Sequence, residues 1–173
     1  SDRLCAPADC EAGLTVGGRA FNGSFAPAGP CAVSLKGPGP DGMLKPDLSW
    51  FSSLRMLGGS VDTGSSYPTG IVSGMAAHTF ANLKDPSVDL VRGLIINATE
   101  LERHDPALGW GTPFHRHLPW ACAPGSVTLA WRARLKPGFA YYWNDIPIPP
   151  ELIQRGKLRG TGRLTAILAP IVS

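Results

Sequence analysis

The segment from Pro68 to Leu83 constrains the fold more than any other part of this chain. Its apolar residues recur at helical spacing, and small residues stand between them. The apolar positions are Ile71, Val72, Met75, Ala76 and Phe80, and the small ones are Gly70, Ser73, Gly74, Ala76 and Ala77. Small residues keep a helix narrow and let its neighbours pack closely. We therefore expect a buried helix that runs to about residue 82.

The flanking segments predict an α/β arrangement. "AGLTVGGRAF" (residues 12–21) is typical of a short buried strand, which we expect over residues 12–18, ended by Gly17 and Gly18. Residues 22–50 are too rich in glycine, proline and aspartate for a long helix. Asp85-Pro86-Ser87 predicts the start of a second helix, "SVDLVRGLIINATEL".

The chain changes character near residue 120. Residues 126–135 and 162–172 have the composition of β-strands, and the proline-rich segment 146–150 between them must be extended without being a central strand. We therefore predict two units, an α/β unit over residues 1–120 and a β-rich extension over residues 121–173. No internal repeat is evident.

Composition sets limits on the partners of the chain. A net charge of +3 with scattered Lys and Arg does not favour nucleic-acid binding. No apolar run reaches the roughly 18 residues of a membrane span, so no membrane partner is predicted. The first ten residues have neither the basic start nor the apolar core of a signal peptide.

The cysteines and histidines leave several alternatives open. Cys5 and Cys10 are close enough for a small disulfide loop and equally compatible with free thiols, and their spacing does not favour zinc. Cys31 and Cys122 complete the set of four and do not settle the redox compartment or the cellular location. His115 and His117 stand at alternate positions that suit a metal, although an exposed loop pair is the favoured interpretation.

Asp62-Thr63-Gly64 spells the active-site turn of an aspartic protease. Such an enzyme needs two of these aspartates sharing a proton, and this chain has one Asp-Thr-Gly triplet. The turn should also lie between strands, whereas Gly58-Gly59 interrupts the preceding segment and a predicted helix follows. We reject this interpretation.

Ser66 is the alternative catalyst. A serine at the start of a helix exposes its Oγ, and the helix N-terminus supplies unpaired N–H groups with a partial positive field. Gly64 leaves room for a substrate backbone. The competing interpretation is a serine-rich cap on an ordinary buried helix.

The flanks of this turn resemble the subtilisin-like serine peptidase family. The family motif is Gly-Thr-Ser followed by a small-residue helix. Five features occur in the family's order, namely Leu14–Gly18, Lys45-Pro46-Asp47-Leu48, Gly64-Ser65-Ser66 with Val72-Ser73-Gly74 and Ala77, "VDLVRGLIINATE", and Leu108–Pro113. They span about residues 12–115, and residues 141–172 resemble the β-rich extension of some large bacterial members.

The resemblance implies the C-terminal part of a subtilisin-like parallel-sheet domain followed by a β-rich segment. It implies a serine endopeptidase acting on polypeptides, with Ser66 as nucleophile, its N–H as an oxyanion donor, and Gly64 and Ser65 against the substrate. No cofactor is implied. A structural calcium is compatible with the family, but no acidic cluster here marks one.

Two departures from the family pattern matter. Ser65 replaces a threonine, and Gly70 stands where the family has a proline. In addition, the family order is aspartate, histidine, serine, yet His78, His104, His115 and His117 all follow Ser66. We therefore expect the chain to need an upstream half-domain or a complementing chain. The alternatives are a degenerate subtilisin-like module that binds peptides or partners without cleaving them, and a structural α/β–β module in which the motif is accidental.

Overall fold

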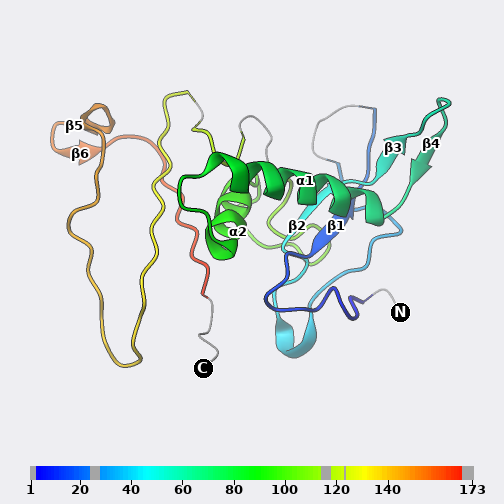
Figure 1. Cartoon of the computed structure of the whole chain (residues 1–173), viewed down its shortest axis with the longest axis horizontal. Helices are drawn as coiled ribbons and strands as arrows, with labels where there is room; N and C mark the ends of the chain where they lie inside the picture. Colours follow the sequence, from blue (N-terminus) through cyan, green and yellow to red (C-terminus); the bar gives the residue numbers. More distant parts are fainter. Residues whose placement is uncertain (1–2, 24–27, 114–117, 123, 169–173) are drawn as a thin grey trace.

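The computed structural model describes residues 3–23, 28–113, 118–122 and 124–168. Its elements are β1 (Val16–Arg19), the 3-10 turn η1 (Pro40–Gly42), β2 (Leu48–Phe51), β3 (Ser53–Arg55), β4 (Val61–Thr63), α1 (Ser66–Asn82), α2 (Val88–Asn97), the 3-10 turn η2 (Pro150–Leu152), β5 (Ile153–Gln154) and β6 (Lys157–Leu158). Figure 1 shows α1, α2 and β1–β4 gathered in one body, with the later part of the chain running beside it as long open loops. The fold is mixed α/β.

A short parallel sheet forms the centre of this body. β1 pairs with β2 in parallel, with Val16 opposite Leu48 and Arg19 opposite Phe51. Loops continue the backbone hydrogen bonding on both outer edges, through Cys31 N to Gly18 O at 2.9 Å and Ser49 N to Gly111 O at 2.9 Å. The pair is therefore embedded, as parallel strands normally are.

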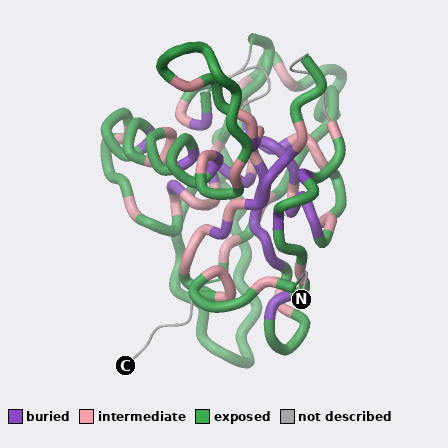
Figure 2. The backbone as a smooth tube through the Cα atoms, turned by 90° about the vertical axis from the view of Figure 1, so that its right-hand side faces the viewer, coloured by how far each residue is buried: buried purple, intermediate pink, exposed green. Residues whose placement is uncertain are grey.

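The core lies where the two helices meet this sheet. Leu48 of β2, Val72 of α1, and Val91 and Ile95 of α2 form one buried cluster. Leu14, Val16, Trp50, Ala76 and Leu83 pack against it and are partly buried. Figure 2 shows the buried backbone concentrated in this central region. Burial of each such aliphatic side chain contributes about 1.5–3 kcal/mol.

The position of α1 agrees with the sequence prediction, but its burial does not. α1 begins at Ser66 and ends at Asn82, and only Pro68, Val72 and Thr79 are buried. Ile71 and Phe80 remain 38% and 37% exposed. The prediction of a buried helix is therefore wrong for most of its surface. Helical spacing identifies which side chains share a face, but the layers packed around the helix decide how many faces are covered.

The second helix and the first strand are both shorter than predicted. Ser87 is the N-cap of α2, and its Oγ accepts a hydrogen bond from Leu90 N at 3.2 Å. The helix ends at Asn97, four residues before the predicted end. β1 begins only at Val16. The Thr15 N–H donates to the Asp47 carboxylate at 2.7 Å, while the Thr15 carbonyl accepts from the backbone N–H groups of Asp47 and Leu48.

The predicted strands after residue 120 are wrong where the structure describes them. Residues 126–135 and 162–168 carry no strand, and residues 169–172 lie outside the described residues. The strands present there, β5 and β6, are an antiparallel pair of two residues each, joined through Arg155 and Gly156 in the left-handed region. Strand-like composition gives a strand only when a neighbouring backbone supplies hydrogen bonds. The division at residue 120 stays a prediction.

Candidate active site

The candidate site is built at the junction of a hairpin and α1. β3 and β4 form an antiparallel hairpin whose turn contains Gly58 and Gly59, both with positive φ (98° and 90°). The glycines that interrupt the sequence pattern are thus the turn of this hairpin. After β4, Gly64 N donates to Ser52 O at 3.0 Å, just past the end of β2. This bond ties the residue before the Ser65-Ser66 pair to the central sheet.

Ser66 is the first residue of α1, and it is exposed. Ser65 is the N-cap with helical dihedrals (φ −68°, ψ −14°), and its side chain makes no capping hydrogen bond. Ser87 of α2, by contrast, has extended dihedrals and caps its helix. The N–H groups in the first turn of α1, which begins with Ser66, therefore have no side-chain cap. Uncapped N–H groups at a helix start can bind an anion.

Asp62 faces the same helix start but is engaged in hydrogen bonds. Its Oδ2 accepts from Tyr67 OH at 2.6 Å, and its Oδ1 accepts from Thr63 N at 2.8 Å. The Tyr67 hydroxyl, and secondly the Thr63 N–H, hold the pKa of Asp62 below its usual value, while the same tyrosine bond raises the pKa of Tyr67. Asp62 is therefore an ionised acceptor on an exposed hairpin, which does not suit the shared-proton chemistry of an aspartic protease.

Replacing Tyr67 with phenylalanine is expected to raise the pKa of Asp62 toward the ordinary value of about 3.9. In the wild type the Asp62–Tyr67 bond stabilises the fold above the ordinary carboxyl pKa, and this contribution is lost as the pH falls through the lowered pKa of Asp62. At alkaline pH it is lost as the pH rises through the raised pKa of Tyr67. Carbon-13 NMR titration of the Asp62 carboxyl measures the shift. Tyr141→Phe is the control, and equal Asp62 titration curves in both variants would contradict the assignment.

No described histidine contacts Ser66. His78 lies twelve residues further along α1, about 18 Å away along the axis at 1.5 Å per residue, and its ring stacks on Trp120 with centroids 6.2 Å apart. His104 bonds through Nε2 to Pro46 O at 2.9 Å and packs edge-on against Trp110. His115 and His117 lie outside the described residues. Within the described part of the chain, Ser66 has no general base.

Asp47 belongs to a buried charged cluster that the sequence analysis did not foresee. Its Oδ2 accepts from Lys45 Nζ at 2.7 Å and from Thr15 N at 2.7 Å, and its Oδ1 accepts from Arg92 at 2.8 Å. Lys45 is 1% exposed and also donates to Gly13 O at 2.7 Å. The cluster joins the start of β2 to the loop before β1 and to α2. The Lys-Pro-Asp motif thus has a structural role here. The feature of the sequence that could have indicated the cluster is a lysine and an aspartate directly before the apolar residues of β2.

A second buried network lies at the far end of β1. The Arg19 guanidinium is 3% exposed, pairs with Glu100 and donates to Thr112 Oγ1 at 2.6 Å. Glu100 in turn accepts from Thr112 N. The network holds the turn Leu108–Pro113 against the sheet, where Gly109 and Gly111 both have positive φ. A Cβ on Gly109 would lie 2.5 Å from the backbone of Asp47, so this close approach requires glycine.

The remaining site candidates do not converge on Ser66. All four cysteines are free, with Cys31 buried and the other three exposed. Among the described residues, no group of three His, Cys, Asp or Glu side chains is arranged to hold a metal. In the same part of the chain, no helix has both the length and the apolar character to cross a bilayer.

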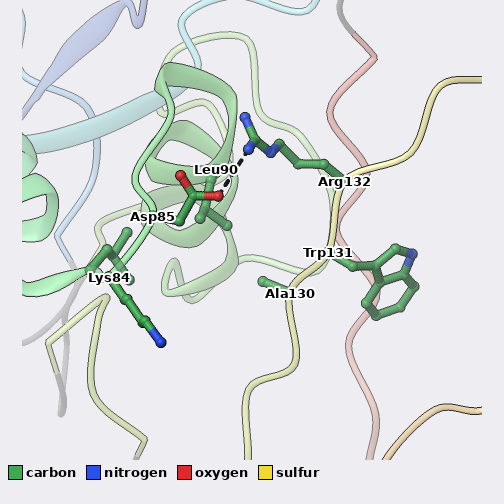
Figure 3. Close-up of a pocket in the computed structure, with 7 residues that line it drawn as sticks. Lys84, Asp85, Leu90, Ala130, Trp131 and Arg132 are labelled. Atoms are coloured by element: carbon green, nitrogen blue, oxygen red, sulfur yellow. Dashed lines mark hydrogen bonds and ion pairs between the residues drawn. The ribbon is translucent and has the colours of Figure 1, made fainter.

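A pocket of about 270 Å³ lies at the other end of α1, lined by Leu83, Lys84, Asp85, Leu90, Ala130, Trp131 and Arg132. Figure 3 shows Arg132 reaching Asp85 across it, at 3.1 Å. Ser66 starts the helix and Leu83 follows its last residue, so the pocket lies about 25 Å from the serine. Its lining contains no serine, threonine, cysteine or histidine, and we assign the pocket no part in the candidate site.

Comparison with models of known protein families finds no match, and neither does comparison with curated protein sequences. The function must therefore be argued from the site itself.

Proposed function

We propose that this chain carries the nucleophile of a serine endopeptidase and that the nucleophile is Ser66. The observation that carries the proposal is the exposed Ser66 hydroxyl at a helix start whose N-cap side chain makes no capping bond. Such a start combines an accessible nucleophile with N–H donors for a developing oxyanion. The resemblance to subtilisin-like peptidases points to the same serine.

In the proposed reaction, Ser66 Oγ attacks the carbonyl carbon of the scissile peptide bond and transfers its proton to a histidine base. The Ser66 N–H supports the oxyanion of the tetrahedral intermediate. The amine leaves with the proton returned by the histidine, and water then hydrolyses the acyl-enzyme. Gly64, tied to Ser52 O, shapes the turn and leaves space for the peptide. Ser65 borders the same substrate position.

The base and its orienting carboxylate must come from outside the described residues of this chain. His78 and His104 are engaged elsewhere, and a serine hydroxyl without a base is a poor nucleophile. We propose that a preceding half-domain or a complementing chain supplies the histidine and the aspartate. The exposed sides of α1, including Ile71 and Phe80, then receive that partner.

A fluorophosphonate probe tests the proposal, because an activated serine attacks its phosphorus and expels fluoride. The 173-residue chain alone should stay unlabelled. The chain co-expressed with the complementing segment should be labelled at Ser66, as identified by peptide mass spectrometry. Ser66→Ala should abolish labelling, whereas Ser73→Ala, which changes an exposed serine two turns further along α1, should not.

The second candidate is a peptide-binding module without catalysis. The observation in its favour is that neither described histidine contacts Ser66, together with glycine at position 70. An unlabelled complemented protein that still binds denatured polypeptide would support this candidate. Rapid labelling of the isolated chain would contradict the need for a complementing segment.

A further inference from the structure

The charges of this chain are distributed unevenly along its length. Eight of the 16 Lys and Arg residues follow residue 113, but only two of the 13 Asp and Glu residues do. The α/β body is therefore acidic and the remainder strongly basic, a difference that the overall charge of +3 conceals. Such asymmetry indicates an anionic partner for the basic part.

Residues 126–148 form an exposed segment with three cations and one carboxylate, which we call the aromatic ribbon. Its two arms reverse at Lys136–Phe139, where Phe139 N donates to Lys136 O at 3.4 Å and Lys136 N donates to Tyr141 OH at 3.0 Å. Trp131 and Trp143 bring the arms together with ring centroids 6.2 Å apart. In Figure 1 the ribbon is the long yellow loop that extends away from the helices.

The side chains of the first arm of the ribbon alternate between apolar and cationic residues. Arg132, Arg134 and Lys136 occupy alternate positions, and the positions between them hold Trp131, Ala133 and Leu135. Cationic and apolar residues therefore alternate along this arm.

The apolar groups are exposed most strongly around the turn of the ribbon. Leu135 is 52% exposed, Phe139 71% and Tyr142 83%, while Trp131 and Trp143 are about half exposed. A contiguous exposed apolar patch on a soluble body marks an interaction surface. The ribbon thus combines an apolar tip, an aromatic middle and cations that alternate with apolar residues.

The cations of the ribbon have almost no partners within the described chain. Arg132 pairs with Asp85, but both side chains are exposed, at 58% and 84%. Neither Arg134 nor Lys136 has a carboxylate within 4 Å among the described residues. Three cations against the single carboxylate of Asp145 also disfavour pairing of this ribbon with a second copy of itself.

We propose that the aromatic ribbon docks on the surface of an anionic lipid bilayer. Arg134 and Lys136 meet the lipid phosphates, and Leu135 and Phe139 enter the boundary between headgroups and acyl chains. Tryptophan and tyrosine favour the headgroup level, which suits Trp131, Tyr142 and Trp143. The apolar tip favours a lipid surface over a nucleic acid, which would be held by cations and stacking alone. This inference does not depend on the proposed peptidase activity.

Sedimentation of the full chain with vesicles tests the inference. Binding to vesicles of 70% phosphatidylcholine and 30% phosphatidylglycerol is expected, with little binding to phosphatidylcholine alone. Raising the salt from about 0.05 M to 0.5 M should release most of the protein, because screening shortens the range of the surface potential. These wild-type measurements need no variant to fold.

Two variants identify the ribbon as the contact. Arg134→Gln with Lys136→Gln should weaken partitioning by about 25-fold, since each cation near an anionic surface contributes roughly fivefold. The matched control, Lys36→Gln with Arg103→Gln, removes the same charge from exposed positions of the body and should change it by less than about threefold. Phe139→Ser should weaken partitioning by about tenfold or more. Leu57→Ser, at a fully exposed position on the other hairpin, should leave it unchanged.

Three outcomes would overturn the proposal. One is equal binding to anionic and neutral vesicles, and another is equal loss in the ribbon variants and their controls. The third is tighter binding to a poly-uridine 20-mer than to anionic vesicles, with loss in the same ribbon variants, which would assign the ribbon to single-stranded nucleic acid.

Discussion

Alanine at position 66 is expected to lower kcat of the complemented protein for peptide hydrolysis by roughly 10⁶-fold, the scale on which loss of the nucleophile acts in serine peptidases. The remaining rate, roughly 10³- to 10⁴-fold above that in water, would come from substrate binding and the oxyanion donors. The reason lies in the position of Ser66, which is exposed at an uncapped helix start. Initial rates on a fluorogenic peptide measure the effect.

Asp62→Asn is the comparison for that experiment. Asp62 is held by Tyr67 and Thr63, and we assign it no proton transfer, so its replacement should change kcat little. A large loss of activity in Asp62→Asn with a small loss in Ser66→Ala would transfer the catalytic role to the aspartate. Circular dichroism of both variants separates catalysis from folding.

Asp47→Ala is expected to destabilise the chain by about 3–5 kcal/mol, because it leaves a buried cation without its carboxylate. Lys45 is 1% exposed and Asp47 5% exposed, so water cannot replace the lost partner easily. The substitution also removes the acceptor for Arg92 and for Thr15 N. Since natural domains are stable by about 5–15 kcal/mol, this loss approaches the whole stability of a small one. Urea unfolding followed by circular dichroism gives the difference.

Asp85→Ala provides the matched control for that loss. It breaks an ion pair of comparable length with Arg132, but both partners are exposed, so the expected change is below about 1 kcal/mol. Adding Lys45→Met to Asp47→Ala should recover part of the stability, because the unpaired buried charge is then gone. Equal effects of Asp47→Ala and Asp85→Ala would show that burial does not govern the cluster.

The elements set by local chemistry were predictable from the sequence. The apolar spacing after Pro68 located α1 to within two residues at its start, and the serine at position 87 marked the N-cap of α2. Both the apolar spacing and the capping interaction join residues only three or four positions apart, so they can be recognised in one sequence without knowledge of distant contacts. The segment Leu108–Pro113 was noted only through the family resemblance, and the structure shows its two glycines with positive φ.

Features that depend on distant neighbours were not predictable in the same way. The exposure of Ile71 and Phe80 depends on which layers cover α1, and the absence of strands in 126–135 depends on a missing partner backbone. β2 was not predicted because most of it lies within the turn-rich stretch of residues 22–50. At the site, the position of Ser66 followed from the sequence, but the Tyr67–Asp62 bond and the Lys45–Asp47–Arg92 cluster required the structure.

The connection between β1 and β2 also has a consequence for how the chain folds. The described part of residues 20–47, which joins the two parallel strands, contains no α-helix. The contacts that close the sheet, from Thr15 to Asp47 and from Asp47 to Trp110, join segments far apart in sequence. Loop-closure entropy opposes these contacts before they can contribute stability. The two helices can form transiently within a microsecond or so. The central strand pair should form late, and until then the apolar sides of α1 and α2 stay exposed to aggregation.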